Sequence, residues 1–194
     1  MEKYRSHFDE VQRQTRIDSA LKSLNLHYFD RSAPSRVISG VALSTRNRNS
    51  KGTAFHAAGM TSTLPCPILL EHDWNSPVGR ILSLEVRGDE ILFRGEVGND
   101  MRRCDDIWMD IIIRSLTGVS VKAGNDVPSD ATFMSWRLDE LSLTRSGADE
   151  GAIITRCSER ESVIYFDGRP SETVYWSTER YLHKPNETFY GSTP

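Results

Sequence analysis

Two residues, Gly88-Asp89, separate two runs of alternating apolar and polar side chains at 78–87 and 90–97. Glycine adopts the positive φ that a tight two-residue turn requires, so the pattern predicts a β-hairpin. A hairpin commits this part of the chain to an antiparallel sheet. Neighbouring segments have similar patterns, and together they indicate a β-rich fold.

Six further segments have the composition or alternation of short strands. They lie at 37–44, 67–70, 117–123, 132–144, 152–155 and 162–166. Two segments have helical spacing instead: residues 4–25 are amphipathic, and residues 100–115 place apolar side chains on one face, with Asp100 as a fitting N-cap. Many short strands with few helices predict a mostly β fold (α+β), a barrel or sandwich that carries helices on its outside.

Charge and composition exclude several classes of protein. The 194 residues include 24 Lys+Arg and 27 Asp+Glu, so the net charge of −3 argues against a nucleic-acid-binding protein. No apolar run approaches the roughly 20 residues of a membrane span, and the charged N-terminus does not resemble a signal peptide. Three cysteines without CxxC spacing indicate neither a disulfide framework nor a zinc knuckle. We expect a soluble protein of a reducing compartment, without nucleic-acid or membrane partners.

The sequence lacks the common cofactor and metal signatures. It contains no GxGxxG, GxxxxGK[ST] or HExxH motif. Its five histidines are widely scattered, and none has the short spacing that preassembles a metal site. We therefore expect no cofactor and no metal.

Two single residues are candidates for chemistry. His72 follows the apolar strand 67–70, and rigid backbone on both sides of it is what a general base requires. Ser120 lies on the polar face of strand 117–123, where it could act as a nucleophile if an imidazole removes its proton. Considered singly, each residue also fits an ordinary position on a protein surface.

The third candidate is the segment 136–152. Strict alternation would place one set of side chains on one face (Leu138, Glu140, Ser142 and Thr144) and a second set on the other (Asp139, Leu141 and Leu143). Either carboxylate could orient a histidine. A strand whose charges face solvent is the alternative, and it is favoured when the segment is considered alone.

The order of these features is more specific than any one of them. It runs from His72, with Pro77-Val-Gly79 downstream, through a helix and Gly118-Val-Ser-Val121 to Leu138–Thr144 and Ala148-Asp149. This combination resembles the prohead maturation protease family of tailed phages, serine peptidases distantly similar to herpesvirus assemblin. The resemblance begins at Arg36-Val-Ile-Ser-Gly-Val-Ala42 and covers about residues 36–155.

The resemblance implies the organisation of the chain and its fold. Residues 1–35 would form an N-terminal amphipathic helix and linker, 36–155 the prohead protease domain, and 156–194 a C-terminal extension. The fold would be a herpesvirus-protease-like β-barrel surrounded by helices.

The resemblance also assigns the site residues. It implies that His72 is the general base and Ser120 the nucleophile. Glu140 would be the third member, because the family places a Glu directly before a hydrophobic-Ser pair. Asp139 is the alternative third member, and His56 is another because assemblin uses a second histidine. Backbone N–H groups would stabilise the oxyanion, with the loop 145–147 as a candidate.

The implied activity is that of a serine endopeptidase of phage prohead maturation. Its substrates would be the scaffold or the major capsid protein, inside the procapsid in the host cytoplasm. Self-cleavage and homo-oligomerisation are also implied.

Departures from the family pattern support an alternative function. Lys122-Ala123 stands where the family usually has a small and an aromatic residue, and Gly147-Ala148 replaces a proline–alanine pair. The alternative is a capsid-assembly or scaffold module that keeps the fold without proteolysis. A hydrolase that uses Cys66 or Cys104 is a further alternative, although Cys104 falls on an apolar helix face that favours packing.

Overall fold

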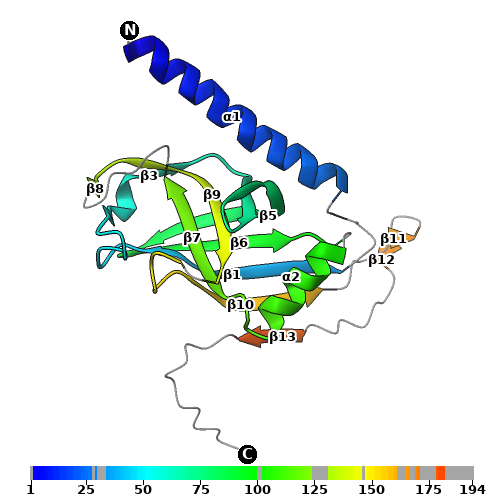
Figure 1. Ribbon diagram of the computed structural model, residues 1–194. Helices are drawn as coiled ribbons and strands as arrows, with labels where there is room; N and C mark the ends of the chain where they lie inside the picture. Colours follow the sequence, from blue (N-terminus) through cyan, green and yellow to red (C-terminus); the bar gives the residue numbers. More distant parts are fainter. Residues whose placement is uncertain are drawn as a thin grey trace, which may run out of the picture.

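A computed structural model describes residues 2–27, 29, 34–99, 102–123, 131–145, 147–160, 165–166, 169–170 and 178–181. Within these described residues, two α-helices and thirteen strands or strand fragments follow one another (Figure 1). Their order is α1 (Glu2–His27), β1 (Ser35–Ser44), β2 (Ala54–Phe55), a short 3-10 helix (Ala57–Gly59), β3 (Met60–Ser62), β4 (Cys66–Leu70), β5 (Asp73–Arg87), β6 (Glu90–Val97), α2 (Arg102–Ile112), β7 (Gly118–Ala123), β8 (Thr132–Phe133), β9 (Trp136–Thr144), β10 (Ile153–Arg160), β11 (Tyr165–Phe166), β12 (Arg169–Pro170) and β13 (Thr178–Tyr181).

Seven of these strands close into a barrel. Their order is β1-β6-β5-β4-β9-β7-β10, and β10 also pairs with β1, which completes the ring. Closure pairs the edges that an open sheet would leave exposed. The expected mostly β barrel with flanking helices is therefore confirmed.

The predicted hairpin is present and joins β5 to β6. Arg87 pairs with Glu90 across the turn, and Gly88 has a φ of 60°. The hairpin is longer than the alternation indicated, because β5 begins at Asp73, directly after the turn that carries His72.

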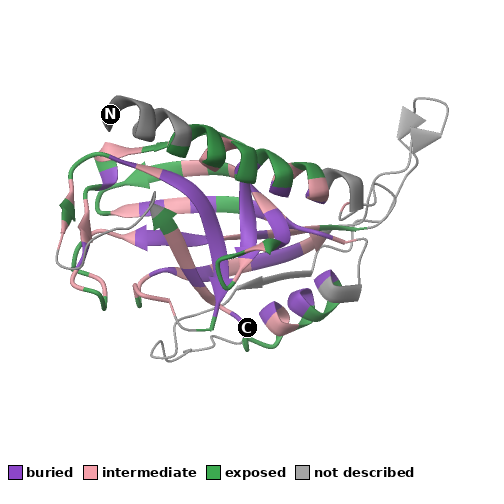
Figure 2. Ribbon diagram, turned by 45° about the horizontal axis from the view of Figure 1, so that its top comes forward, coloured by how far each residue is buried: buried purple, intermediate pink, exposed green. Residues whose placement is uncertain are grey.

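Apolar side chains from most strands fill the barrel. Figure 2 shows that the buried residues follow the barrel strands, whereas the outer face of α1 is exposed. A barrel of this size has no room for a channel, so its inward-facing side chains form the core. The fully buried members include Ile38, Ile68, Val78, Ile81, Ile91, Val119, Leu141, Leu143 and Ile154.

The two helices lie outside the barrel and bury one face each. α2 buries Cys104, Ile107, Trp108 and Ile111, all members of the predicted apolar face. The expected N-cap Asp100 and the apolar Met101 lie outside the described residues. α1 packs against β5 and β4, and it buries Ile17, Ala20 and Leu24 at the spacing of a helix stripe.

Some strand boundaries differ from the sequence-based prediction. The expected strand 132–144 is divided into β8 and β9, and the expected strand 152–155 continues to Arg160 as β10. Of the expected strand 162–166, residues 165–166 form β11 and 162–164 lie outside the described residues. The division of the chain into three parts at residues 35 and 155 stays a prediction.

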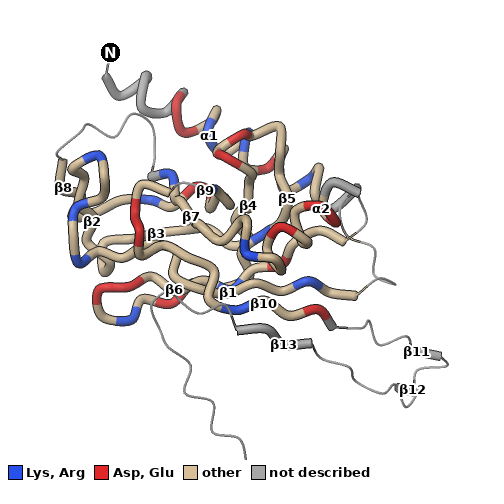
Figure 3. Tube along the Cα trace, turned by 60° about the horizontal axis from the view of Figure 1, so that its bottom comes forward, with Lys and Arg blue, Asp and Glu red and all other residues tan. Residues whose placement is uncertain are grey.

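Charged residues of both signs are distributed along the chain. Figure 3 shows Lys and Arg interspersed with Asp and Glu along the described part of the chain. Among the described residues, no helix is long and apolar enough to span a membrane.

A substitution at Gly40 tests the close pairing of β1 with β10 that completes the barrel. A Cβ atom at this position would lie 2.1 Å from the Ile153 carbonyl oxygen in the paired strand β10. We expect Gly40→Ala to destabilise the fold by about 2–3 kcal/mol, because backbone atoms must move to relieve the contact. Thermal unfolding measures the effect.

Gly88→Asn is the matched control for Gly40→Ala. Nothing lies within 4 Å of a Cβ at Gly88, and asparagine tolerates its positive φ. We expect a melting temperature close to that of the wild type. Equal melting temperatures for the two variants would contradict the assigned role of Gly40.

Candidate active site

The turn between β4 and β5 carries His72 in an unusual backbone conformation. Glu71 and His72 have φ values of 50° and 61°, a region that costs a non-glycine residue about 1–3 kcal/mol. Two hydrogen bonds, donated by backbone N–H groups of the turn to acceptors in β9, hold the turn in place. The Glu71 N–H donates to the Leu143 carbonyl oxygen at 3.0 Å. The His72 N–H donates to Ser142 Oγ at 3.0 Å.

The Glu71 side chain adds a second attachment to the same strand. Its carboxylate accepts the hydroxyl of Thr144 at 2.7 Å and the backbone N–H of Arg145 at 3.0 Å. The turn is therefore fastened to the end of β9 through both its backbone and a side chain. This compensates the unfavourable conformation and fixes the direction in which the imidazole leaves the backbone.

Three side chains form a continuous chain of hydrogen bonds at this turn. His72 Nδ1 lies 2.6 Å from Glu140 Oε1, and His72 Nε2 lies 3.0 Å from Ser120 Oγ. With the proton on Nδ1 bonded to the carboxylate, Nε2 is free to accept the serine hydroxyl. The geometry can therefore transfer a proton from Ser120 to His72.

In this chain of hydrogen bonds the carboxylate is far more buried than the imidazole. The Glu140 side chain is 0% exposed, whereas the His72 side chain is 39% exposed. A buried carboxylate needs partners to offset its lost hydration. Glu140 Oε1 has His72, and Oε2 accepts the hydroxyl of Ser142 at 2.7 Å.

The pairing of the strands explains why these residues meet. In the sheet β9 lies between β4, whose following turn carries His72, and β7, which carries Ser120. Ser120 pairs with Ser142 and Lys122 pairs with Glu140 across the antiparallel β7–β9 ladder. The site thus forms on the face of these strands that lies opposite the core.

The alternation predicted for residues 138–144 is interrupted at Asp139. Lys122 pairs with Glu140 but Ala123 pairs with Leu138, so β9 contains one extra residue, a β-bulge. Leu138 consequently belongs to the core together with Leu141 and Leu143. The expectation that it shares a face with Glu140 is wrong, because the bulge shifts the register.

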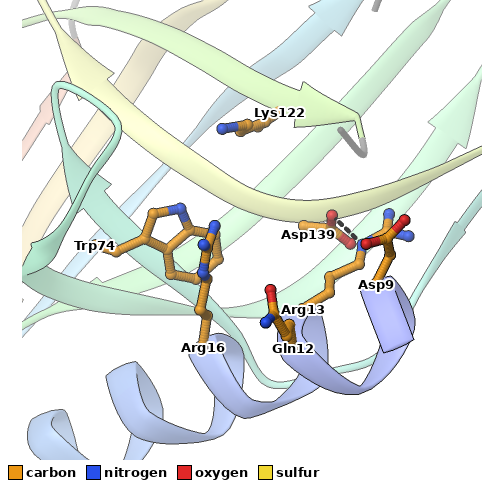
Figure 4. Close-up of a pocket in the computed structure, with 7 residues that line it drawn as sticks. All are labelled: Asp9, Gln12, Arg13, Arg16, Trp74, Lys122 and Asp139. Atoms are coloured by element: carbon orange, nitrogen blue, oxygen red, sulfur yellow. Dashed lines mark hydrogen bonds and ion pairs between the residues drawn. The ribbon is translucent and has the colours of Figure 1, made fainter. Parts of the chain in front are cut away.

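Asp139 is turned away from His72, toward α1. It forms ion pairs with Arg13 of α1 and with Arg137, and among the described residues it has no hydrogen bond to a histidine. Figure 4 shows Asp139 and Arg13 meeting in a crevice between α1 and the barrel. The other residues that line the crevice are Asp9, Gln12, Arg16, Trp74 and Lys122. The structure therefore brings together His72, Ser120 and Glu140, not Asp139.

Two further alternatives occupy other positions. His56 precedes the 3-10 helix, and within the described part of the chain no hydrogen bond joins its ring to His72. In the loop considered for the oxyanion, the Arg145 N–H is already bonded to Glu71, and Ser146 lies outside the described residues.

Glu71 and Ser142 are site residues that the sequence reasoning gave no role. Ser142 could have been found, because alternation placed it on the same face as Glu140. Glu71 carried no comparable signal. Its contribution depends on a turn conformation that no local motif indicates.

The cysteines are buried and form no part of this chain of hydrogen bonds. Cys66, Cys104 and Cys157 are all buried, and none of the three is in a disulfide bond. Cys66 Sγ donates to the Asp139 carbonyl oxygen at 3.0 Å. Burial, followed by the nearby carboxylates of Glu140 and Asp139, raises the pKa of the Cys66 thiol well above its usual range. The described residues contain no cluster of three or more His, Cys, Asp or Glu side chains that could hold a metal ion.

We expect the thiols of the folded protein to resist alkylation at mildly alkaline pH. The thiolate is the reactive form, and a raised pKa keeps Cys66 protonated as pH rises past the range where a free thiol ionises. Titration with a thiol reagent, with and without urea, measures the accessible thiols. Fast modification of Cys66 in the folded protein would contradict this expectation and would reopen a cysteine-dependent activity.

Comparison with known proteins shows similarity in sequence to a phage protein. The chain is 30% identical over 132 residues to the capsid polyprotein of Pseudomonas phage PAJU2, which covers 62% of this chain and 20% of the polyprotein. The chain thus spans about a fifth of the length of this relative. No family model matches the chain.

Solved structures with a similar arrangement include two herpesvirus proteases. The KSHV protease in complex with a hexapeptide phosphonate inhibitor has a TM-score of 0.46 and 16% identity, and the match covers 64% of each chain. The varicella-zoster virus protease has a TM-score of 0.42 and 12% identity, over 62% of this chain and 63% of that chain.

Proposed function

We propose that this protein is a serine endopeptidase that processes capsid or scaffold proteins during phage prohead maturation. The observation that carries the proposal is the chain of hydrogen bonds from Glu140 through His72 to Ser120, at 2.6 and 3.0 Å. A serine, a histidine and a carboxylate in this order are the groups that acyl transfer requires.

In this reaction the Ser120 hydroxyl attacks the carbonyl carbon of a peptide bond. A C–O bond forms, and the hydroxyl proton moves to His72 Nε2. His72 then gives that proton to the leaving amine as the C–N bond breaks, which leaves an acyl-serine. A water molecule, deprotonated by the same imidazole, hydrolyses the acyl-serine and restores Ser120. Glu140 stabilises the imidazolium that forms twice in this cycle and keeps its Nδ1 proton oriented.

The sequence relative supports a capsid protein as substrate. The matched segment belongs to a phage protein named a capsid polyprotein and makes up 20% of it. We infer that the protease acts on capsid or scaffold chains within the procapsid, and that its own terminal segments are further substrates.

Ser120 is tested by labelling and by substrate processing. We expect a serine-directed phosphonate to modify Ser120 and Ser120→Ala to abolish capsid cleavage on co-expression, since the attacking oxygen is gone. Peptide mapping and gel analysis provide the readouts. Unchanged cleavage by Ser120→Ala would disprove the assigned nucleophile. A protein that is neither labelled nor active would instead be a non-proteolytic assembly module.

The two neighbouring carboxylates provide a matched pair of variants. Glu140→Gln places an amide against His72 Nδ1, so we expect the wrong imidazole tautomer and a rate about 10⁴-fold lower. Asp139→Asn removes the same charge one residue away, where the side chain binds Arg13 instead. We expect Asp139→Asn to stay within about tenfold of the wild type, as for a residue outside the reacting groups. The rates of phosphonate labelling of the two variants are compared. A larger loss of labelling rate for Asp139→Asn than for Glu140→Gln would make Asp139 the third member.

A further inference from the structure

We infer that Ser142 is a positioning residue, whose hydroxyl group sets the geometry of both His72 and Glu140. The inference rests on the proposed function, because the geometry matters through the proton transfer from Ser120. Among the described hydrogen bonds, the Ser142 hydroxyl bonds neither to Ser120 Oγ nor to His72 Nε2. It acts through its two neighbours.

The hydroxyl of Ser142 uses both of its hydrogen-bonding capacities. It donates to Glu140 Oε2 at 2.7 Å and accepts the backbone N–H of His72 at 3.0 Å. A hydroxyl has one proton to give and lone pairs to accept, so the two bonds are compatible and fix the direction of its O–H bond.

These two bonds and the bond from Glu140 to the imidazole form a closed ring. The ring runs from the His72 backbone N–H to Ser142 Oγ, through both carboxylate oxygens of Glu140, and back to His72 Nδ1. The backbone and the imidazole of His72 are thus both hydrogen-bonded to the same pair of side chains, Ser142 and Glu140. Rotation of the imidazole or of the carboxylate would break a bond of this ring.

Burial makes the hydroxyl difficult to replace. The residues Ser142 and Glu140 are both 0% exposed, so a water molecule from solvent does not substitute for the lost donor. Among the described residues, Ser142 is the donor that satisfies Glu140 Oε2. A carboxylate oxygen left without a donor in such surroundings turns toward another partner, and the imidazole follows it.

The position of Ser142 in the sheet links it to the nucleophile. It pairs directly with Ser120 across the β7–β9 ladder, and its neighbour in β4 is Leu69, close to the start of the His72 turn. One residue of β9 therefore lies beside both strands that contribute to the site.

A pair of isosteric substitutions isolates the hydroxyl. Ser142→Thr keeps the hydroxyl and adds a methyl group, whereas Ser142→Val has the same shape without the hydroxyl. Any cost of overpacking is common to both. We expect Ser142→Val to be phosphonylated at Ser120 about 10- to 100-fold more slowly than Ser142→Thr, the factor for a lost hydrogen bond to a charged group. The loss should lie in the maximal rate of phosphonylation, with the concentration dependence unchanged.

A spectroscopic measurement tests the positioning without catalysis. The Nδ1 proton of His72 in a short bond to a carboxylate gives a downfield proton NMR signal. We expect this signal in the wild type and in Ser142→Thr, and its loss in Ser142→Val. Equal signals and equal labelling rates in the two folded variants would overturn the inference. A wild type that shows the signal but resists labelling would overturn the proposed function alone.

Ser142→Ala keeps the test decisive if the β-branched variants fail to fold. Its control is Ser62→Ala, which removes another hydroxyl bonded to β9, from Ser62 Oγ to the Leu138 carbonyl oxygen at 3.3 Å. Slower labelling and a lost Nδ1 signal for Ser142→Ala, but not for Ser62→Ala, support the positioning role. The same behaviour in both variants would refute it.

Discussion

The candidate site depends on the pairing of β9 with β4 on one side and β7 on the other. Parallel pairing with β4 brings the end of that strand, and therefore the His72 turn, beside the end of β9. Antiparallel pairing with β7 aligns Ser120 with Ser142. A slip of one residue in either ladder would turn the reacting side chains to the other face of the sheet. Closure of the barrel opposes such a slip, because every strand of the ring has partners on both sides.

The bulge in β9 gives two adjacent carboxylates different environments. Asp139 meets two arginines, one from α1, whereas Glu140 meets a histidine and a serine hydroxyl. In a regular strand neighbouring side chains leave on opposite faces, and one of the pair would point into the apolar core. The bulge avoids the cost of an unpaired charge among leucines. As a result, two consecutive residues of β9 have different contacts: Asp139 attaches α1 and Glu140 orients His72.

Spacing and turn preferences in the sequence predicted those parts of the fold that depend on neighbouring residues. The turn at Gly88-Asp89, the apolar face of α2 and the mostly β class follow from spacing and from the conformational freedom of glycine. The bulge at Asp139 and the full burial of Glu140 do not, because they depend on α1 and on strands far away in the sequence. A charged strand considered alone indicates a solvated face, yet β9 is buried along most of its length.

The site shows the same division between local and distant information. Alternation placed Ser120, Glu140 and Ser142 on polar faces, and the resemblance to a family chose among them. The 2.6 Å contact of His72 with Glu140 required the positive φ of two consecutive residues in the turn, which nothing in Glu71-His72 announces. The role of Ser142 follows from a backbone N–H, a group that side-chain patterns do not represent.

The difference in exposure between Glu140 and His72 has a consequence for hydration. Glu140 is sealed from solvent, and His72 is partly open on the side that faces Ser120. Water can therefore arrive at the serine end, where an ester would be hydrolysed, without competing for the carboxylate end. Solvent access is thus confined to the imidazole side of the site, and the charge of the carboxylate is shielded from solvent.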